Sequence, residues 1–238
     1  MTSPSHNSLP QEAASANPSD TDTTSTSTTT TDSPPSADLQ AKLSTYPVHD
    51  HNNQHHQFQE LYTGPDAAPR TLIVFIRHFF CGSCKEYIRT LSQTLTPDYL
   101  AGLTPPTGIV IIGCGDPGLI DTYLAETGCV FPLYADPERK LYAELGLGLS
   151  LAMGEKPGYI QRSMGRVVAE SVWANLRQMT RGLGWKGGDQ RQNGGEFLFQ
   201  ATEGSQGKGE VVWCHRMRNT RDHTEVDVLR GMLEGRRS

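Results

Sequence analysis

The chain of 238 residues contains no run of about 18 consecutive apolar residues. Its N-terminus also lacks the basic start and apolar stretch of a secretory signal. These absences argue against a membrane-spanning helix and against secretion. We therefore expect a soluble, cytoplasmic protein that does not act at a membrane. The length allows one ordinary domain or two small ones, and we expect one.

Positive charge is also scarce. The 21 Lys and Arg residues are outnumbered by 26 Asp and Glu residues, which gives a formal net charge of −5, and no basic block occurs. Nucleic acids and anionic membranes bind to a concentrated positive face. We therefore expect neither as a partner of this chain.

Cysteine is too rare for a disulfide scaffold, since only five are present in the whole chain. In a reducing compartment, so few cysteines indicate redox or metal chemistry instead. Two of them, Cys114 and Cys129, have no partner at a meaningful spacing and are interpreted as packing residues. The other three are Cys81, Cys84 and Cys214.

Large apolar side chains are nearly absent from residues 1–45, which are rich in Ser, Thr, Pro and Asn. Such a segment buries too little apolar surface to offset the entropy of ordering, so we expect a disordered tail. Residues 46–57 are rich in histidine and are expected to form a solvated linker. Weak metal binding is the alternative, although no carboxylate or thiol cluster accompanies the histidines. The globular domain is expected over residues 58–238.

The strongest strand signal is the apolar run of residues 71–77, whose length and continuity predict a strand buried on both faces. The sequence Cys81-Gly-Ser-Cys84 follows directly. Apolar residues then recur at helical spacing from Tyr87 to Leu95. The two cysteines are therefore predicted at a junction between a buried strand and a helix.

The remaining elements complete an α/β sandwich with a mixed central sheet, helices on both faces and a helical insertion. We expect strands at 108–114, 130–134, 196–200 and 210–214, helices after Asp116-Pro117 and Asp136-Pro137, an amphipathic helix at 164–179 within an insertion of about 146–195, and a last helix that starts at a capping box of Asp222 and Glu225.

A cysteine at a helix N-terminus has its thiolate stabilised by free backbone N–H groups and by the helix dipole. We therefore interpret Cys81 as a nucleophile and Cys84, one helical turn away, as the thiol that resolves its adduct. Two alternatives stay open. A structural zinc site would need Cys214 and His215 as a second pair, but adjacent strand residues point in opposite directions. The cysteines could also be incidental core residues.

Three basic residues are candidates for a supporting role. His78, three residues before Cys81, could act as a base or stabilise the thiolate, or could make only a local hydrogen bond. Arg77 could supply positive charge or lie solvated at the sheet edge. Arg216 belongs to a segment, residues 215–221, with three Arg and one His. It could position an anionic thiolate or peroxide, or form part of a solvated connection.

Four separated motifs occur in the order found in one known family. They are Phe75-Ile-Arg-His-Phe-Phe-Cys-Gly-Ser-Cys-Lys-Glu-Tyr87, Asp136-Pro-Glu-Arg-Lys-Leu-Tyr142, Gly194-Gly-Glu-Phe-Leu-Phe199 and Trp213-Cys-His-Arg-Met-Arg-Asn-Thr-Arg-Asp-His-Thr-Glu225. With these motifs the chain resembles the AhpC/TSA antioxidant group, and within it the peroxiredoxin-like 2, thioredoxin-like branch, which includes fungal members. The resemblance extends over residues 58–233.

This resemblance implies a thioredoxin-like fold with Cys81 and Cys84 at the redox positions and no cofactor or metal. It further implies a thioredoxin or glutathione system as the thiol reductant, and a disulfide or a peroxide as the substrate. Some members of the branch reduce lipid endoperoxides. The resemblance thus implies a thiol-disulfide oxidoreductase or antioxidant protein.

Typical peroxiredoxins carry a proline seven residues, and a Thr or Ser three residues, before the reactive cysteine. Here Val74 and His78 precede Cys81 at those spacings, and Arg77 and Cys81 precede Cys84. Neither register matches, so disulfide exchange is the first expectation. A peroxidase or endoperoxide reductase is one alternative, and a non-enzymatic redox-sensing or binding module is another.

Overall fold

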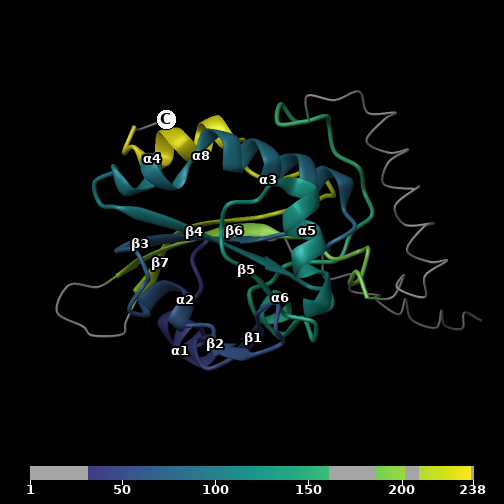
Figure 1. The fold of residues 1–238 in the computed structure, drawn as a ribbon, viewed down its shortest axis with the longest axis horizontal. Coiled ribbons are helices and arrows are strands. Elements are labelled where there is room, and N and C mark those ends of the chain that lie inside the picture. The colour runs from purple at the N-terminus through teal and green to yellow at the C-terminus, as the bar shows by residue number, and fades with distance from the viewer. Residues whose placement is uncertain (1–31, 161–185, 202–208, 237–238) are drawn as a thin grey trace, which may run out of the picture.

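The computed structural model describes residues 32–160, 186–201 and 209–236, which form a seven-stranded sheet with helices on both of its faces (Figure 1). The strand order is β2-β1-β5-β4-β3-β6-β7. Strands β3, β4 and β5 run parallel, and the other pairs are antiparallel, so the predicted mixed sheet is confirmed. The strands are β1 (Pro47–His49), β2 (His55–Gln57), β3 (Arg70–Phe75), β4 (Thr107–Gly113), β5 (Leu133–Ala135), β6 (Gly195–Ala201) and β7 (Gly209–Arg216).

Strand β3 is an inner strand of the sheet, between β4 and β6, and all six of its residues are buried. It pairs in parallel with β4 and antiparallel with β6. A continuous apolar run suits a strand covered on both faces, as the sequence predicted. The carboxyl end of β3 therefore leads the chain from the interior of the sheet toward residues 76–81.

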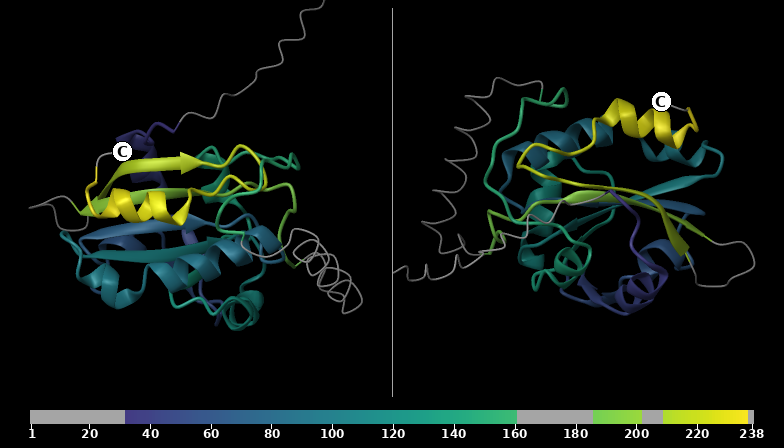
Figure 2. Two further views of the ribbon diagram at one scale, coloured as in Figure 1. Left: turned by 90° about the horizontal axis from the view of Figure 1, so that it is seen from above. Right: turned by 180° about the vertical axis from the view of Figure 1, so that it is seen from behind.

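Helices divide between the two faces of the sheet (Figures 1 and 2). The first core, which includes Ile88, Leu91 and Leu198, lies under α3, α4, α5 and α8. The second core, which includes Phe58 and Phe197, lies under α1, α2 and α6. The helices are α1 (Ala37–Ser44), α2 (Glu60–Thr63), α3 (Gly82–Thr94), α4 (Pro97–Ala101), the 3-10 helix η1 (Pro117–Leu119), α5 (Ile120–Thr127), α6 (Lys140–Glu144) and α8 (Val226–Leu233).

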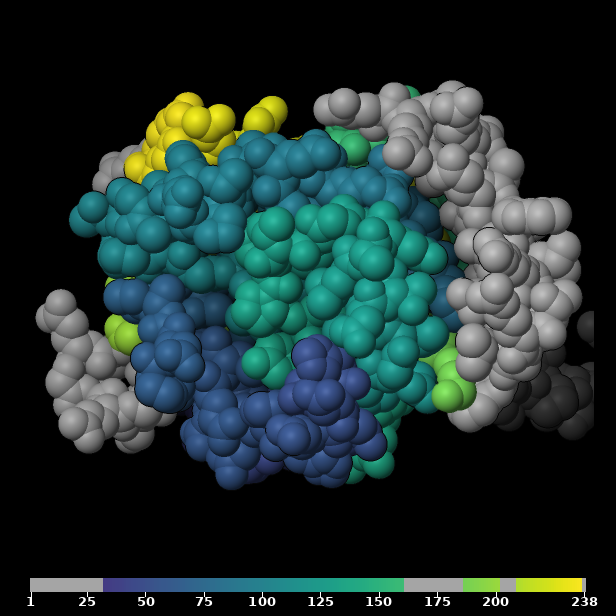
Figure 3. Space-filling model, viewed as in Figure 1, coloured from purple at the N-terminus to yellow at the C-terminus, as the bar shows by residue number. Residues whose placement is uncertain are grey.

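The N-terminal part of the described chain differs from the predicted tail and linker. Helix α1 and strands β1 and β2 are built from residues assigned to those segments, and they form the lower part of the face seen in Figure 3. Leu43 and Val48 are fully buried against the second core. These few apolar side chains pack against the core on the sheet, which supplies a stabilisation that the composition of an isolated segment does not reveal.

The last helix does not begin with the predicted capping box. Glu225 is the N-cap of α8 but makes no side-chain cap, because its Oε1 accepts a hydrogen bond from the backbone N–H of Gly158 at 2.7 Å. Asp222 instead accepts from the N–H of Arg218 at 2.8 Å. Both carboxylates therefore fix loops rather than the helix start.

The predicted insertion is described only at its two ends. The amphipathic helix expected at 164–179 lies outside the described residues. The returning segment packs on the end of the sheet, where the N–H of Phe79 donates to the carbonyl of Gly187 at 3.0 Å. Across the described ranges, no helix is long and apolar enough to cross a membrane.

Candidate active site

Cys81 ends the loop that follows β3 and is the N-cap residue of α3. Its backbone is extended, with φ −73° and ψ 111°, and its Sγ accepts a hydrogen bond from the N–H of Cys84 at 3.4 Å. An N-cap side chain satisfies a backbone donor that has no partner within the helix. The sulfur of Cys81 therefore lies at the positive end of the helix dipole, as the sequence predicted.

Arg77 brings a fixed positive charge to the same sulfur. Its Nη1 lies 3.5 Å from Sγ of Cys81. Nε donates to the carbonyl of Gln192 at 3.0 Å, and Nη2 donates to the carbonyl of Gln190. The segment that returns from the insertion thus orients the arginine toward Cys81.

The two thiols have opposite acidities. The pKa of Cys81 is held well below its ordinary value, first by a hydrogen bond from the Cys84 side chain and then by the positive charge of Arg77, which together outweigh burial. Burial raises the pKa of Cys84, and the neighbouring Cys81 sulfur raises it further. The pair therefore favours one thiolate, on Cys81, beside one protonated thiol.

His78 is placed next to Cys81, but it is not charged at neutral pH. The residue is buried, and burial lowers the pKa of its imidazole to about 4. Its Nδ1 is buried without a hydrogen-bond partner. Its carbonyl accepts from the N–H of Cys81 at 3.0 Å, which shapes the turn before the helix. His78 therefore makes the local hydrogen bond expected as its alternative role, but with its backbone carbonyl and not with its imidazole.

Arg216 is not brought to the thiols. It lies over the ring of Phe197, in the second core, on the opposite face of the sheet from α3. Its Nε donates to the carbonyl of Leu145 at 2.6 Å, and Nη1 donates to the carbonyl of Ser33 at 2.9 Å. These contacts join β7, the end of α6 and the chain before α1. Arg216 is thus buried and bound to backbone carbonyls. This placement matches neither of the two roles expected for it, which were positioning a thiolate or peroxide and forming part of a solvated connection.

Two functional candidates were missed by the sequence reasoning. Nε2 of His223 lies 3.5 Å from Sγ of Cys84, and Nδ1 lies 2.5 Å from Oε1 of Glu196. Both side chains are fully buried. A signal existed for Glu196, which is a carboxylate in the otherwise apolar start of β6. Nothing in spacing indicated that His223, in the loop after β7, returns to Cys84.

Among the described residues, no group of three or more His, Cys, Asp or Glu could hold a metal ion. The side chains of Cys214 and His215, the second pair that a zinc site would need, have different partners. Sγ of Cys214 contacts Arg216, while Nε2 of His215 lies 2.7 Å from the carbonyl oxygen of Asp222. The histidines of residues 46–57 lie in and between β1 and β2.

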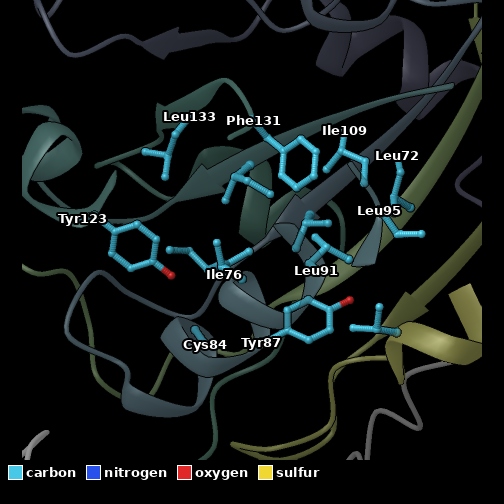
Figure 4. Packing of buried hydrophobic residues seen from close by; sticks show 14 of the residues in the cluster. Leu72, Ile76, Cys84, Tyr87, Leu91, Leu95, Ile109, Tyr123, Phe131 and Leu133 are labelled. Carbon is cyan, nitrogen blue, oxygen red and sulfur yellow. The ribbon is translucent and has the colours of Figure 1, made fainter. Parts of the chain in front are cut away.

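The two cysteines have little solvent exposure. Cys81 is 5% exposed and Cys84 is fully buried, and Figure 4 shows Cys84 with Tyr87 among the packed residues of the first core. Neither thiol is in a disulfide. With so little of Cys81 exposed, a small oxidant reaches it more readily than the surface of a folded protein does. The arrangement therefore suits attack by one sulfur on a small molecule.

Comparisons with known proteins identify relatives of this chain. The family model described as AhpC/TSA antioxidant enzyme matches residues 90–219. Peroxiredoxin-like 2C of Homo sapiens is 29% identical over 196 residues, covering 80% of this chain and 78% of that protein. Peroxiredoxin-like 2C of Mus musculus is 28% identical over 194 residues, with the same coverage of both chains.

Two solved structures from Xanthomonas campestris share the fold. The bacterioferritin comigratory protein, described for its alkyl peroxide reduction activity, superposes with a TM-score of 0.50 at 14% identity, covering 82% of this chain and 94% of that one. Peroxiredoxin Q superposes with a TM-score of 0.50 at 15% identity, covering 82% and 93%. The sheet and its helices are therefore thioredoxin-like. The family match spans more than half of the chain, which thus belongs to the AhpC/TSA antioxidant enzyme family.

Proposed function

We propose that this protein is a thiol-dependent antioxidant oxidoreductase in which Cys81 attacks the oxidant and Cys84 resolves the product. The observation that carries this proposal is the asymmetry of the pair. Cys81 has a lowered pKa at a helix N-cap beside Arg77, whereas burial raises the pKa of Cys84. A thiolate is the nucleophilic form of cysteine, and a protonated neighbour waits until the first adduct exists.

The reaction with a hydroperoxide balances with these two sulfurs. The Cys81 thiolate attacks one peroxide oxygen, the O–O bond breaks, and the alcohol leaves after taking up a proton. Cys84 then attacks the resulting sulfenic acid, water leaves, and a Cys81–Cys84 disulfide forms. An external dithiol, from a thioredoxin or glutathione system, returns two electrons and restores both thiols.

The substrate that fits best is a small hydroperoxide. The 5% exposure of Cys81 leaves little room for a protein disulfide, and alkyl peroxide reduction is the activity described for one protein of the same fold. A small disulfide is the second candidate. The CxxC at the helix start favours exchange chemistry, and Cys81 lacks the proline and the Thr or Ser of typical peroxidatic sites. Both substrates use the same two sulfurs. We place this activity in the cytoplasm, where a reducing environment keeps thiols free.

Single-cysteine variants test the assignment. Turnover of hydrogen peroxide, tert-butyl hydroperoxide and oxidised glutathione would be followed through oxidation of NADPH coupled to thioredoxin or glutathione reductase systems. We expect Cys81→Ser to abolish turnover, and Cys84→Ser to react once and then stall as an adduct on Cys81. Cys129→Ser, away from the pair, is the matched control and should retain wild-type turnover. Full turnover by Cys81→Ser would contradict the proposal, and a wild-type protein without any turnover would favour a redox-sensing module.

A further inference from the structure

A buried acid-base pair lies behind the second thiol. His223, in the loop between β7 and α8, contacts Cys84 through Nε2 at 3.5 Å and Glu196 through Nδ1 at 2.5 Å. Histidine and glutamate are both without solvent exposure. Buried polar groups need hydrogen-bond partners, and here each side chain supplies one for the other. The contact therefore fixes the positions of both side chains.

The orientation of the imidazole is set by Glu196 and Tyr87, and Thr224 in turn holds Glu196. The carboxylate of Glu196 accepts hydrogen bonds only, so Nδ1 carries the proton and Nε2 presents its lone pair to Cys84. The ring of Tyr87 stacks on His223 with centroids 4.3 Å apart and planes within 4°. Oε2 of Glu196 accepts from the hydroxyl of Thr224 at 3.1 Å. The acceptor nitrogen is therefore held facing the thiol.

We propose that His223 accepts the proton of Cys84 when Cys84 closes the disulfide, and that Glu196 positions the imidazole and stabilises its charged form. The inference rests on the proposed function, because it concerns the second step of that reaction. His223 touches a reacting sulfur and is thus a catalytic residue. Glu196 acts through His223 and is a positioning residue.

The proton follows the same path for either oxidant, but the sulfur that is reduced differs. Cys84 gives its proton to Nε2 as its sulfur bonds to Sγ of Cys81. With a sulfenic acid, the sulfur of Cys84 is oxidised and the sulfur of Cys81 is reduced as hydroxide leaves. With a mixed disulfide, the sulfur of Cys84 is oxidised, the sulfur of Cys81 stays at the disulfide level, and the sulfur of the departing thiol is reduced. The leaving hydroxide or thiolate takes the proton from His223, so water or a thiol departs and the imidazole is neutral again.

Other titratable groups around His223 do not compete for this role. Burial raises the pKa of Tyr87, which stacks on the ring, and that of Tyr159, whose ring centroid is 6.5 Å away. Both phenols therefore stay protonated at neutral pH. From β7, His215 approaches Glu196, and nearby carboxylates raise the pKa of His215 although burial opposes the shift. Glu196 is the anion in direct contact with His223.

The test separates the two steps in the full-length protein. Reduced protein is mixed with one equivalent of hydrogen peroxide, quenched with N-ethylmaleimide at increasing times and analysed by mass spectrometry. Loss of the Cys81 thiol reports the first step, and appearance of the Cys81–Cys84 disulfide reports the second. For His223→Asn we expect an unchanged first step, within about twofold, and a second step at least about tenfold slower at neutral pH.

Glu196→Gln keeps an acceptor for Nδ1 and removes the charge, so it should slow the second step less than His223→Asn does. His56→Asn is the matched control, since His56 also pairs with a carboxylate, that of Asp50 at 3.3 Å, but lies on β2. The decisive measurement is the rate of the second step as a function of pH. As pH rises, Cys84 ionises without a base, so the rates of both variants should converge on that of the wild type.

Each outcome decides one question. A wild type that never closes the disulfide contradicts the proposed function together with this inference. A wild type that closes it while Glu196→Gln and His223→Asn close it equally fast overturns the role of His223 alone. A slowing that is the same at every pH indicates a structural role and also overturns the inference. Where His223→Asn does not fold, Glu196→Gln supplies the decision through its pH profile.

Discussion

Arg77 contacts both sulfurs of the CxxC sequence, through different atoms. Its Nη1 lies 3.5 Å from Sγ of Cys81, while its backbone N–H donates to Sγ of Cys84 at 3.4 Å. The guanidinium of Arg77 is therefore held beside Sγ of Cys81, whereas Sγ of Cys84 is reached only by the backbone N–H of Arg77. The charge of Arg77 adds to the hydrogen bond from the Cys84 side chain, which is the larger cause of the lowered pKa of Cys81, while burial raises the pKa of Cys84.

Removing the guanidinium should raise the pKa of Cys81. For Arg77→Met we expect the thiolate fraction of Cys81 to fall. Oxidation of Cys81 at neutral pH should then slow by about tenfold for each unit by which the pKa of Cys81 exceeds the pH of the experiment. The carbonyls of Gln190 and Gln192 also lose their donors, so the free energy of unfolding should fall by about 1–3 kcal/mol. Stopped-flow oxidation and urea unfolding measure the two effects.

Arg139→Met is the control for that experiment. Arg139 contacts Asp189 at 3.0 Å and the side chain of Gln192 at 3.4 Å, so it supports the same segment without a hydrogen bond to Cys81 or Cys84. We expect its Cys81 pKa to match that of the wild type. An equal loss of reactivity in both variants would show that the segment, and not the charge of Arg77, controls Cys81.

His78 should contribute little charge to the reaction. Because burial lowers the pKa of His78 to about 4, the imidazole is neutral at pH 7. For His78→Gln we expect the rate of Cys81 oxidation at neutral pH to stay within about twofold of wild type. A large loss in a protein that unfolds cooperatively would restore His78 as a base or as a cationic partner of the thiolate.

The same histidine should make the fold sensitive to acid. Its pKa is about 4 when folded and near 6.5 in the unfolded chain, so the unfolded state binds the proton first as pH falls. The stability is intact above about pH 6.5, and about 2 kcal/mol should be lost between about pH 7 and pH 5. Urea titrations at both pH values should show a smaller loss for His78→Gln, and identical losses would contradict the expectation.

Arg216 should matter for stability and not for chemistry. Arg216→Met leaves the carbonyl of Leu145 without its buried donor, so we expect the free energy of unfolding to fall by about 1–3 kcal/mol. The rate of Cys81 oxidation in the folded variant should equal that of the wild type. A slower reaction at unchanged stability would place Arg216 in the active site after all.

The sheet and the cysteine junction could be predicted because local patterns determine them. An apolar run such as β3 and a helix that starts at Cys81 depend on neighbours in sequence. Helix α1 could not be predicted in this way, because its stability comes from the docking of Leu43 on distant residues.

The second half of the site depends on long-range folding. His223 and Glu196 are 27 residues apart, and they meet only because the loop after β7 turns back over the face that carries α3. The side of the sheet to which Arg216 points follows from its pairing with Gly195, after a register shift between Leu198 and Phe199. A one-residue shift reverses the facing of a strand, so spacing alone could not place Arg216.

The most direct test is the acidity of Cys81 in the wild-type protein. Its alkylation by iodoacetamide would be followed across pH, with tandem mass spectrometry to separate Cys81 from Cys84 in the peptide that contains both. We predict that Cys81 reacts first and that its pKa lies well below the value of about 8.5 for a free thiol. A pKa at or above that value, or earlier alkylation of Cys84, would contradict the account.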